Sequence, residues 1–213
     1  MIGLYRFLLS SIGKKQMMAV TGLCFCGFLS VHLFGNFTMY GGPGAFDSYA
    51  EKLHSLGFIL NLAELGLVFF ALVHVSTGAL LFLQNFTARP MRYAVNKSAR
   101  GKTLSSTLMP YTGLLILSFV ITHLLNFTLV DKADRTISVI VAGVFNSPPY
   151  VAFYVAAMVI LFLHVRHGFW SAFQTFGANH PRYMPVIRLF SVVFAVILAG
   201  GFGSFPLFVL VTT

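Results

Sequence analysis

The chain alternates between long apolar stretches and short polar segments. Each apolar stretch exceeds the about 20 residues that a helix needs to cross the hydrocarbon core of a bilayer. The pattern therefore predicts five transmembrane helices, at about residues 17–40, 60–85, 107–130, 150–177 and 186–212. Two shorter surface helices are expected over residues 1–13 and 45–58. The fold class is all-α, with residues 1–213 forming a single transmembrane domain.

Composition supports this interpretation. Hydrophobic residues make up 57% of the chain and charged residues only 9%, and a soluble domain of this length needs more charge to cover its surface. The first span is longer than the apolar core of a signal peptide, so we expect it to be retained. Cys24 and Cys26 are expected to be packing residues rather than a disulfide or metal pair. Without a soluble domain, nucleic-acid binding is not expected.

The basic residues predict an orientation. They gather before span 1, between spans 2 and 3, and between spans 4 and 5, whereas the other two loops mix charges of both signs. The basic set is Arg6, Lys14, Lys15, Arg89, Arg92, Lys97, Arg100, Lys102, Arg182 and Arg188. Because positive loops stay in the cytoplasm, the N-terminus is expected inside and the C-terminus outside. This basic face suits anionic headgroups or an acidic protein partner.

Four of the predicted spans each carry one histidine, and these are His32, His74, His123 and His164. An imidazole in hydrocarbon is costly unless it has a partner, and such residues usually face the interior of a bundle. A single intramembrane histidine is often only a packing group. Four histidines, one per span, are harder to explain in that way.

An internal repeat relates the two halves of the chain. Thr21-Gly22-Leu23 precedes His32, and Thr112-Gly113-Leu114 precedes His123, with eleven residues from threonine to histidine in both cases. Spans 2 and 4 match more weakly through a glycine four residues after each histidine. Spans 1–2 and 3–4 are therefore predicted to be two parallel copies of a helix hairpin.

Parallel repeats are related by an axis along the membrane normal. Such an axis makes His32 face His123, and His74 face His164, at two different depths. Each pair can supply both axial ligands to one haem iron, whereas a structural zinc ion takes four ligands. The repeat thus predicts two haem b groups. Span 5 has no histidine and is expected to be peripheral.

Residues around the histidines extend this prediction. Gly78 and Gly168 lie one turn beyond His74 and His164, where the lack of a side chain leaves room for a porphyrin edge. Thr21 and Thr112 lie on the same helix face as the histidine of their own span but about 16 Å away along the axis. Their hydroxyls are therefore expected to point toward the guest of the other pair.

Other polar residues leave alternatives open. Arg166 and His167 are candidates for contacts with haem propionates, or their side chains reach the interface instead. Glu64 is the only carboxylate within a predicted span. Desolvation suits such a group to proton handling, but a carboxylate at a helix start also interacts favourably with the helix dipole.

The sequence resembles a known family through several motifs. They are Lys-Lys-Gln-Met-Met-Ala-Val-Thr-Gly-Leu at 14–23, His32 followed by Asn36, Thr112-Gly113 with His123, and His164-x3-Gly-Phe-Trp-Ser-Ala-Phe ending at residue 173. In this combination the whole chain resembles the single-chain, di-haem cytochrome b subunit of succinate:quinone oxidoreductases and quinol:fumarate reductases.

The resemblance implies a respiratory role in the cytoplasmic membrane of a bacterium. The family's cytochrome b anchors a flavoprotein subunit and an iron–sulfur subunit on the cytoplasmic face. It carries electrons, whereas the dicarboxylate chemistry takes place on a partner subunit. The resemblance implies that His74 and His164 hold the haem nearer the iron–sulfur partner, and that His32 and His123 hold the distal haem. A menaquinone site is implied near the distal haem, with Asp47, Glu51, His54 and Glu64 as its available polar groups.

One departure from the family pattern matters. Some fumarate reductases of this kind have a proton-conducting glutamate two residues before the histidine of span 4, and here that position is Phe162. Two other functions remain open from the residues alone. One is a cytochrome b anchor of a different membrane oxidoreductase, and the other is a haem-free transporter with histidines on its pathway.

Overall fold

The computed structural model describes residues 2–88, 104–132 and 135–212, and within these ranges the regular structure is entirely helical. Five helices are long and apolar enough to cross a membrane, which confirms the predicted number of spans. They are α2 (Ser11–Asn36), α4 (Phe58–Thr87), α5 (Leu104–Phe127), α7 (Pro148–Thr175) and α8 (Met184–Thr212). A short 3₁₀ turn, η1 (Phe37–Gly41), extends α2. The first span therefore starts earlier than predicted, because Lys14 and Lys15 lie inside the helix.

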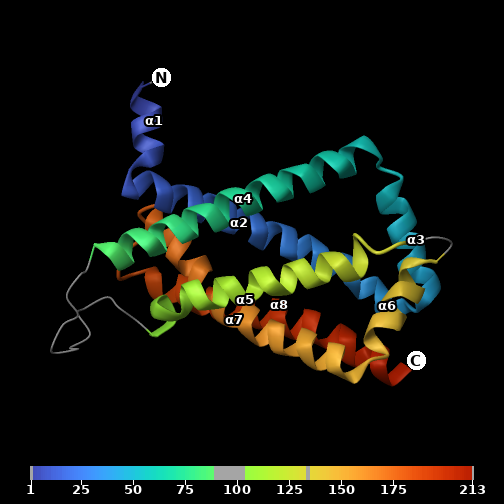
Figure 1. Ribbon diagram of the computed structural model, residues 1–213. Coiled ribbons are helices and arrows are strands. Elements are labelled where there is room, and N and C mark those ends of the chain that lie inside the picture. Colours follow the sequence, from blue (N-terminus) through green and yellow to red (C-terminus); the bar gives the residue numbers. More distant parts are fainter. Residues whose placement is uncertain (1, 89–103, 133–134, 213) are drawn as a thin grey trace.

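Three shorter helices lie at the two ends of the bundle (Figure 1). α1 (Ile2–Leu9) and α3 (Pro43–His54) correspond to the two surface helices expected from the sequence. α6 (Ile137–Phe145) was not predicted, because its nine residues are too few for a span and lack a polar face. It packs against α3, and Asp47 on α3 accepts hydrogen bonds from the backbone N and the Oγ of Ser138 at 2.9 and 2.7 Å.

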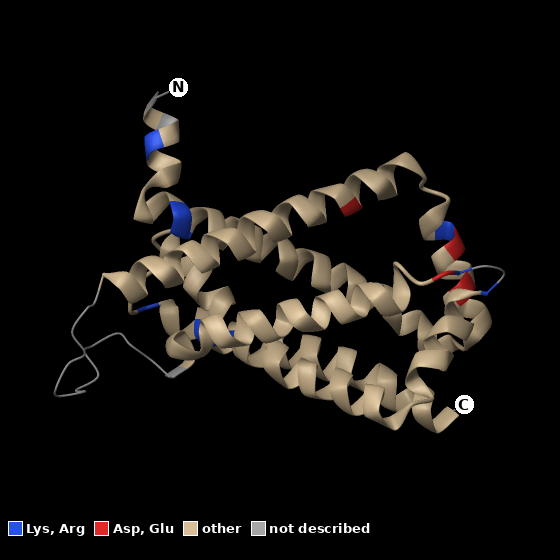
Figure 2. Ribbon diagram, viewed as in Figure 1, with Lys and Arg blue, Asp and Glu red and all other residues tan. Residues whose placement is uncertain are grey.

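Charge divides the two ends of the bundle (Figure 2). At the end that holds the N-terminus, every described charged side chain is basic; we call this the basic end. The other end holds α3, α6 and the C-terminus, and there acidic and basic residues mix. The basic end also receives the C-terminus of α4 and the start of α5.

Four helices form a ring. α2 packs against α4 and α7, α5 packs against α7, and α4 and α5 touch only lightly. In this order α2 lies diagonally opposite α5, and α4 lies diagonally opposite α7. This arrangement decides which side chains can meet across the centre of the bundle.

α8 is part of the core, so the expectation of a peripheral fifth span is wrong. It packs along α7, and Ser191 and Ala195 are fully buried, with Leu198 exposed by only 1%. Small residues allow this close approach: a Cβ at Gly201 would lie 2.7 Å from Cδ1 of Leu33 on α2. The fifth span has no histidine, but this did not indicate how closely the helix would pack against the others.

α4 and α7 differ strongly in burial. α7 has eight buried residues along its length, whereas α4 has only Thr77 and Leu81, both in its second half. The first half of α4 diverges from the other helices toward the end that holds α3 (Figure 1). Packing against other parts of this chain therefore holds α4 mainly at the basic end.

Candidate functional site

The ring of four helices brings the histidines together in two pairs. His32 on α2 and His123 on α5 have ring centroids 6.0 Å apart, with their planes at 87°. His74 on α4 and His164 on α7 have centroids 6.5 Å apart, with their planes at 64°. Each pair joins diagonally opposite helices.

The separations suit a metal ion with two axial imidazoles. Two metal–nitrogen bonds of about 2.0–2.1 Å each, plus the distance from each nitrogen to its ring centre, give about 6 Å between centroids. Among the described residues no group of three or more His, Cys, Asp or Glu side chains could hold a metal. If iron lay between each pair, the two histidines would be its axial ligands and a macrocycle such as haem would supply the others.

A threonine on the adjacent helix holds each histidine of the His74–His164 pair. Thr21 Oγ1 lies 3.0 Å from Nδ1 of His74, and Thr112 Oγ1 lies 3.1 Å from Nδ1 of His164. Both threonines are buried. The threonines thus reach the other pair, as their helical position requires, but they contact its histidines directly.

The hydrogen bonds of Thr21 suit one tautomer of His74. Its hydroxyl also lies 2.8 Å from the carbonyl oxygen of Met17, which can only accept. When Thr21 donates its one proton to Met17, its oxygen can accept from Nδ1–H of His74. In that tautomer Nε2 of His74 carries the lone pair that a metal ligand needs.

The same logic applies at the second histidine of this pair. Thr112 Oγ1 lies 3.1 Å from the carbonyl oxygens of both Leu108 and Met109, to which it can donate. When it does, His164 can donate from Nδ1 to Thr112 and keep its lone pair on Nε2. Both histidines of the pair thus have a hydroxyl beside Nδ1 that suits the metal-binding tautomer.

Glycines beside these rings leave little spare space. A Cβ at Gly22 would lie 3.4 Å from Cε1 of His74, and a Cβ at Gly113 would lie 3.5 Å from Cε1 of His164. The sequence contained this signal, because both glycines belong to the repeated Thr-Gly-Leu. They were nevertheless not predicted as site residues.

Gly78 and Gly168, the glycines that were predicted, face methionines instead. A Cβ at Gly78 would meet Sδ of Met18 at 3.7 Å, and a Cβ at Gly168 would meet Cε of Met109 at 3.9 Å. These methionines occupy equivalent places in the two halves. The space in front of each glycine is therefore bordered by an unbranched side chain with several rotatable bonds.

Aromatic rings surround the His32–His123 pair. Phe28 stacks on His32 at 5.3 Å, and Phe119, its repeat equivalent, lies 5.8 Å from His123. Phe202 of α8 also contacts the His32 ring. Nδ1 of His123 is buried and has no hydrogen-bond partner within the described part of the chain. The two pairs thus differ in what contacts Nδ1 of their histidines.

Helix geometry gives the relative depth of the pairs. His32 follows Thr21 by eleven residues, which is about 16 Å along α2 and away from the basic end. Because Thr21 contacts His74, the two pairs are separated by about this distance along the bundle. Glu64 precedes His74 by ten residues on the antiparallel α4, about 15 Å. Along the bundle it therefore lies near the level of His32, on the part of α4 that diverges, and it is exposed.

The other polar candidates lie on α3. Asp47, Glu51 and His54 follow one side of this helix, and Glu51 and His54 are exposed. His54 Nδ1 bonds the carbonyl oxygen of Ala50 at 2.7 Å. Partial burial raises the pKa of Asp47, but hydrogen bonds from Ser138 and Thr136 lower it more, so the net pKa lies below its ordinary value. Asp47 therefore serves first as the acceptor that joins α3 to α6.

Arg166 and His167 lie on different sides of α7. Arg166 is exposed, whereas His167 is buried, and its ring packs edge-on against Trp170 at 4.9 Å. Nδ1 of His167 is also buried without a hydrogen-bond partner among the described residues. The two side chains do not converge on one point.

Comparison of this chain with protein-family models, with curated proteins and with solved structures gives no match.

Proposed function

We propose that this protein is the di-haem cytochrome b subunit of a succinate:quinone oxidoreductase or quinol:fumarate reductase. It anchors a flavoprotein subunit and an iron–sulfur subunit on the cytoplasmic side of a bacterial membrane and exchanges electrons with menaquinone or menaquinol. The observation that carries the proposal is the presence of two opposed histidine pairs on diagonal helices. The family assignment itself rests on the motifs quoted above.

The local chemistry of the pairs supports haem over a transport role. A histidine that relays protons exchanges them at both nitrogens, and its hydrogen bonds must allow both tautomers. His74 and His164 instead each have Nδ1 within 3.1 Å of a buried threonine hydroxyl that also contacts backbone carbonyls of its own helix. This arrangement suits fixed ligands better than a proton pathway.

The residues of this chain would perform three tasks. The four histidines would hold iron from both sides, with Thr21 and Thr112 orienting two of them. The surrounding apolar and aromatic side chains would exclude water and so influence the potentials. Bound haem would supply reversible one-electron transfer. Dicarboxylate chemistry would belong to the partner subunit, so no catalytic residue is assigned here.

Quinone chemistry is proposed near the His32–His123 pair. Glu64 is the strongest of the four polar candidates for handling quinol protons, because it lies near that level of the bundle and no other span carries Asp or Glu. Asp47 is less suited, since Ser138 already occupies its oxygens.

Spectroscopy of the purified protein tests the haem assignment. We expect a reduced b-type spectrum with two haems per chain, and co-purification of a flavoprotein and an iron–sulfur protein. A colourless, stably folded protein would contradict the haem assignment and favour the transporter interpretation. Two haems with different partner subunits would instead identify an anchor of another oxidoreductase.

Charge movement tests the consequence of Phe162, a residue of α7 that is partly buried and packs against the hydrophobic core. Moving one charge across a membrane involves about 2.3 kcal/mol per 100 mV. Without a carboxylate at this position to carry compensating protons, quinone-coupled turnover in proteoliposomes should slow under an opposing membrane potential. Turnover that ignores the potential would contradict this part of the proposal.

A further inference from the structure

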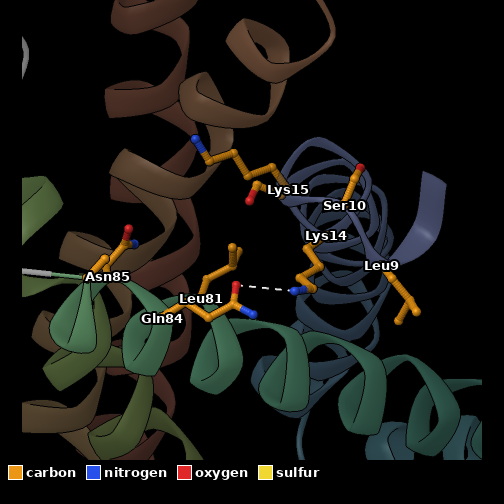
Figure 3. Close-up of a pocket in the computed structure, with 9 residues that line it drawn as sticks. Leu9, Ser10, Lys14, Lys15, Leu81, Gln84 and Asn85 are labelled. Atoms are coloured by element: carbon orange, nitrogen blue, oxygen red, sulfur yellow. Dashed lines mark hydrogen bonds between the residues drawn. The ribbon is translucent and has the colours of Figure 1, made fainter. Parts of the chain in front are cut away.

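A polar pocket lies at the basic end, outside the histidine pairs (Figure 3). Its volume is about 520 Å³, and it lies between the junction of α1 with α2 and the last turns of α4. The lining residues are Leu9, Ser10, Ser11, Lys14, Lys15, Leu81, Gln84, Asn85 and Ala88. Polar groups thus converge from α2, the residue before it and α4, with Leu9 of α1 and Leu81 of α4 also in the lining.

The described part of the chain places no acidic side chain beside the lysines of this pocket. Lys14 Nζ donates to Oε1 of Gln84 at 3.1 Å, a neutral acceptor (Figure 3). The acidic residues that the structure describes are Asp47, Glu51, Glu64 and Asp131, and none of them lies at the basic end. Among the described residues, nothing balances the positive charge of this pocket.

The position of the pocket favours a lipid as the source of that charge. α1 turns steeply away from the bundle axis (Figure 1), and its described side chains include Tyr5, Phe7 and Leu9, exposed by 67%, 42% and 55%. Apolar side chains at this place are stable in the interfacial region of a bilayer. An acidic protein segment bound to the lysines alone would offer them no such apolar surroundings.

We propose that this pocket binds the phosphate of an anionic phospholipid. Lys14 and Lys15 supply the charge, and the hydroxyl of Ser11 and the amides of Gln84 and Asn85 supply uncharged hydrogen bonds. The positive end of the α2 dipole adds to the attraction. Leu9 and Leu81 border the start of the acyl chains. This proposal is independent of the haem assignment.

Lipid titration of the purified, delipidated protein tests the proposal. Thermal unfolding would be followed while phosphatidylglycerol or phosphatidylcholine is added in mixed micelles. The unfolding temperature should rise with phosphatidylglycerol only. Lys14→Gln/Lys15→Gln should weaken this apparent affinity about 30-fold, since each basic residue near an anionic headgroup contributes about a factor of five.

Matched variants separate the site from general charge. Lys52→Gln/Lys132→Gln removes the same charge at the opposite end, and Lys14→Arg/Lys15→Arg keeps the charge in place; both should bind as the unaltered protein does. Lys15→Gln alone retains the Lys14–Gln84 bond and should weaken binding about fivefold. This single variant guards against a folding defect in the double variant.

Three results would overturn the proposal. Equal loss in the Lys52/Lys132 variant would show only diffuse attraction. Equal stabilisation by inorganic phosphate would assign the pocket to a soluble anion. Unchanged lipid binding by Lys14→Gln/Lys15→Gln, with loss of a co-purifying subunit, would assign it to a protein partner.

Discussion

The His74–His164 pair and the His32–His123 pair share one geometry but have different supports. Both pairs bridge diagonal helices at similar ring separations. In the first pair a buried threonine holds Nδ1 of each ring, and a glycine packs beside it. In the second pair aromatic rings surround the imidazoles, and Nδ1 of His123 has no partner among the described residues.

The difference separates two ways of orienting an imidazole in an apolar interior. A hydrogen bond to Nδ1 fixes both the ring and its tautomer, and it makes the ligand more basic. Aromatic stacking fixes the ring plane but leaves the tautomer open. Under the proposed haem ligation, the pair held by hydrogen bonds should be oriented before haem binds, whereas the orientation of the other pair should depend more on the haem.

The largest expected effect comes from removing two ligands at once. His74→Leu/His164→Leu should leave one haem per chain, because the other pair is untouched. His32→Leu/His74→Leu should leave none, because each pair loses one axial ligand. Haem and protein content of the purified variants measures both ratios.

This experiment tests the pairing itself. If the His74/His164 variant lost both haems while it remained folded, the two pairs would not be separate sites. Helix content by circular dichroism controls for folding.

Filling the space beside His164 should affect one pair only. A Cβ at Gly113 would already lie 3.5 Å from Cε1 of His164. The two further methyl groups of Gly113→Val should therefore displace the imidazole, and the haem that it is proposed to hold should be lost. Gly113→Ala should be tolerated, since that distance is an ordinary contact. Haem content and the reduced spectrum report the result.

Gly66→Val provides the control, because a Cβ at Gly66 on α4 would meet no atom within 4 Å. Equal haem loss in this variant would mean that bulk anywhere in the spans disrupts the site. The effect at Gly113 would then say nothing about His164.

Removing the threonine hydroxyl should weaken the His74–His164 site without abolishing it. Thr112→Val keeps the shape but leaves the buried Nδ1–H of His164 without an acceptor, which costs about 1–3 kcal/mol. The unfolding temperature should fall, and haem at this pair should become easier to reduce because its ligand is less basic. Thermal unfolding and redox titration measure the two changes.

Thr122→Val on the same helix is the matched control, since its hydroxyl bonds only the backbone oxygen of Ser118. A shift of both haem potentials in Thr112→Val, or an equal shift in Thr122→Val, would remove the distinction between the pairs.

The smallest expected effect concerns the contact between α3 and α6 at the end near His32 and His123. The pKa of Asp47 is lowered from an ordinary 3.8. Its contribution to stability is therefore fully present above that value and is lost as pH falls through the lower folded pKa. The protection factors of the α6 amides, which correct for the pH dependence of intrinsic exchange, should be constant from neutral pH to about pH 4 and fall below it.

Asp47→Asn should remove this acid-dependent step, whereas amides of α2 and α4 at the basic end should behave alike in both proteins. A loss of protection in α6 already between pH 7 and 5 would contradict the lowered pKa.

The sequence predicted the spans and the histidine pairs for separable reasons. Span number followed from apolar length, which a bilayer imposes on any helix that crosses it. The pairing followed from the repeat, since Thr21 and Thr112 stand at equal distances before His32 and His123. The structure gives the same pairs of neighbours, while their ligation of haem stays a prediction.

Other features could not be read from the pattern. α6 is too short and too uniformly apolar for its sequence pattern to distinguish it from a loop at the membrane surface. Gly78 and Gly168 were chosen for their position relative to the histidines, but Gly22 and Gly113 lie closer to the rings. Spacing along one helix cannot tell which neighbouring helix its face will meet.

The sequence by itself determined the helices, their number and the placement of one histidine in each of four spans, because these depend on local hydrophobicity and helical period. Only the tertiary structure decided that α8 belongs to the core and that α2 lies across from α5. It also decided that Thr21 and Thr112 meet His74 and His164. Those results depend on how side chains of several helices fit together at once, and a linear pattern does not contain that information.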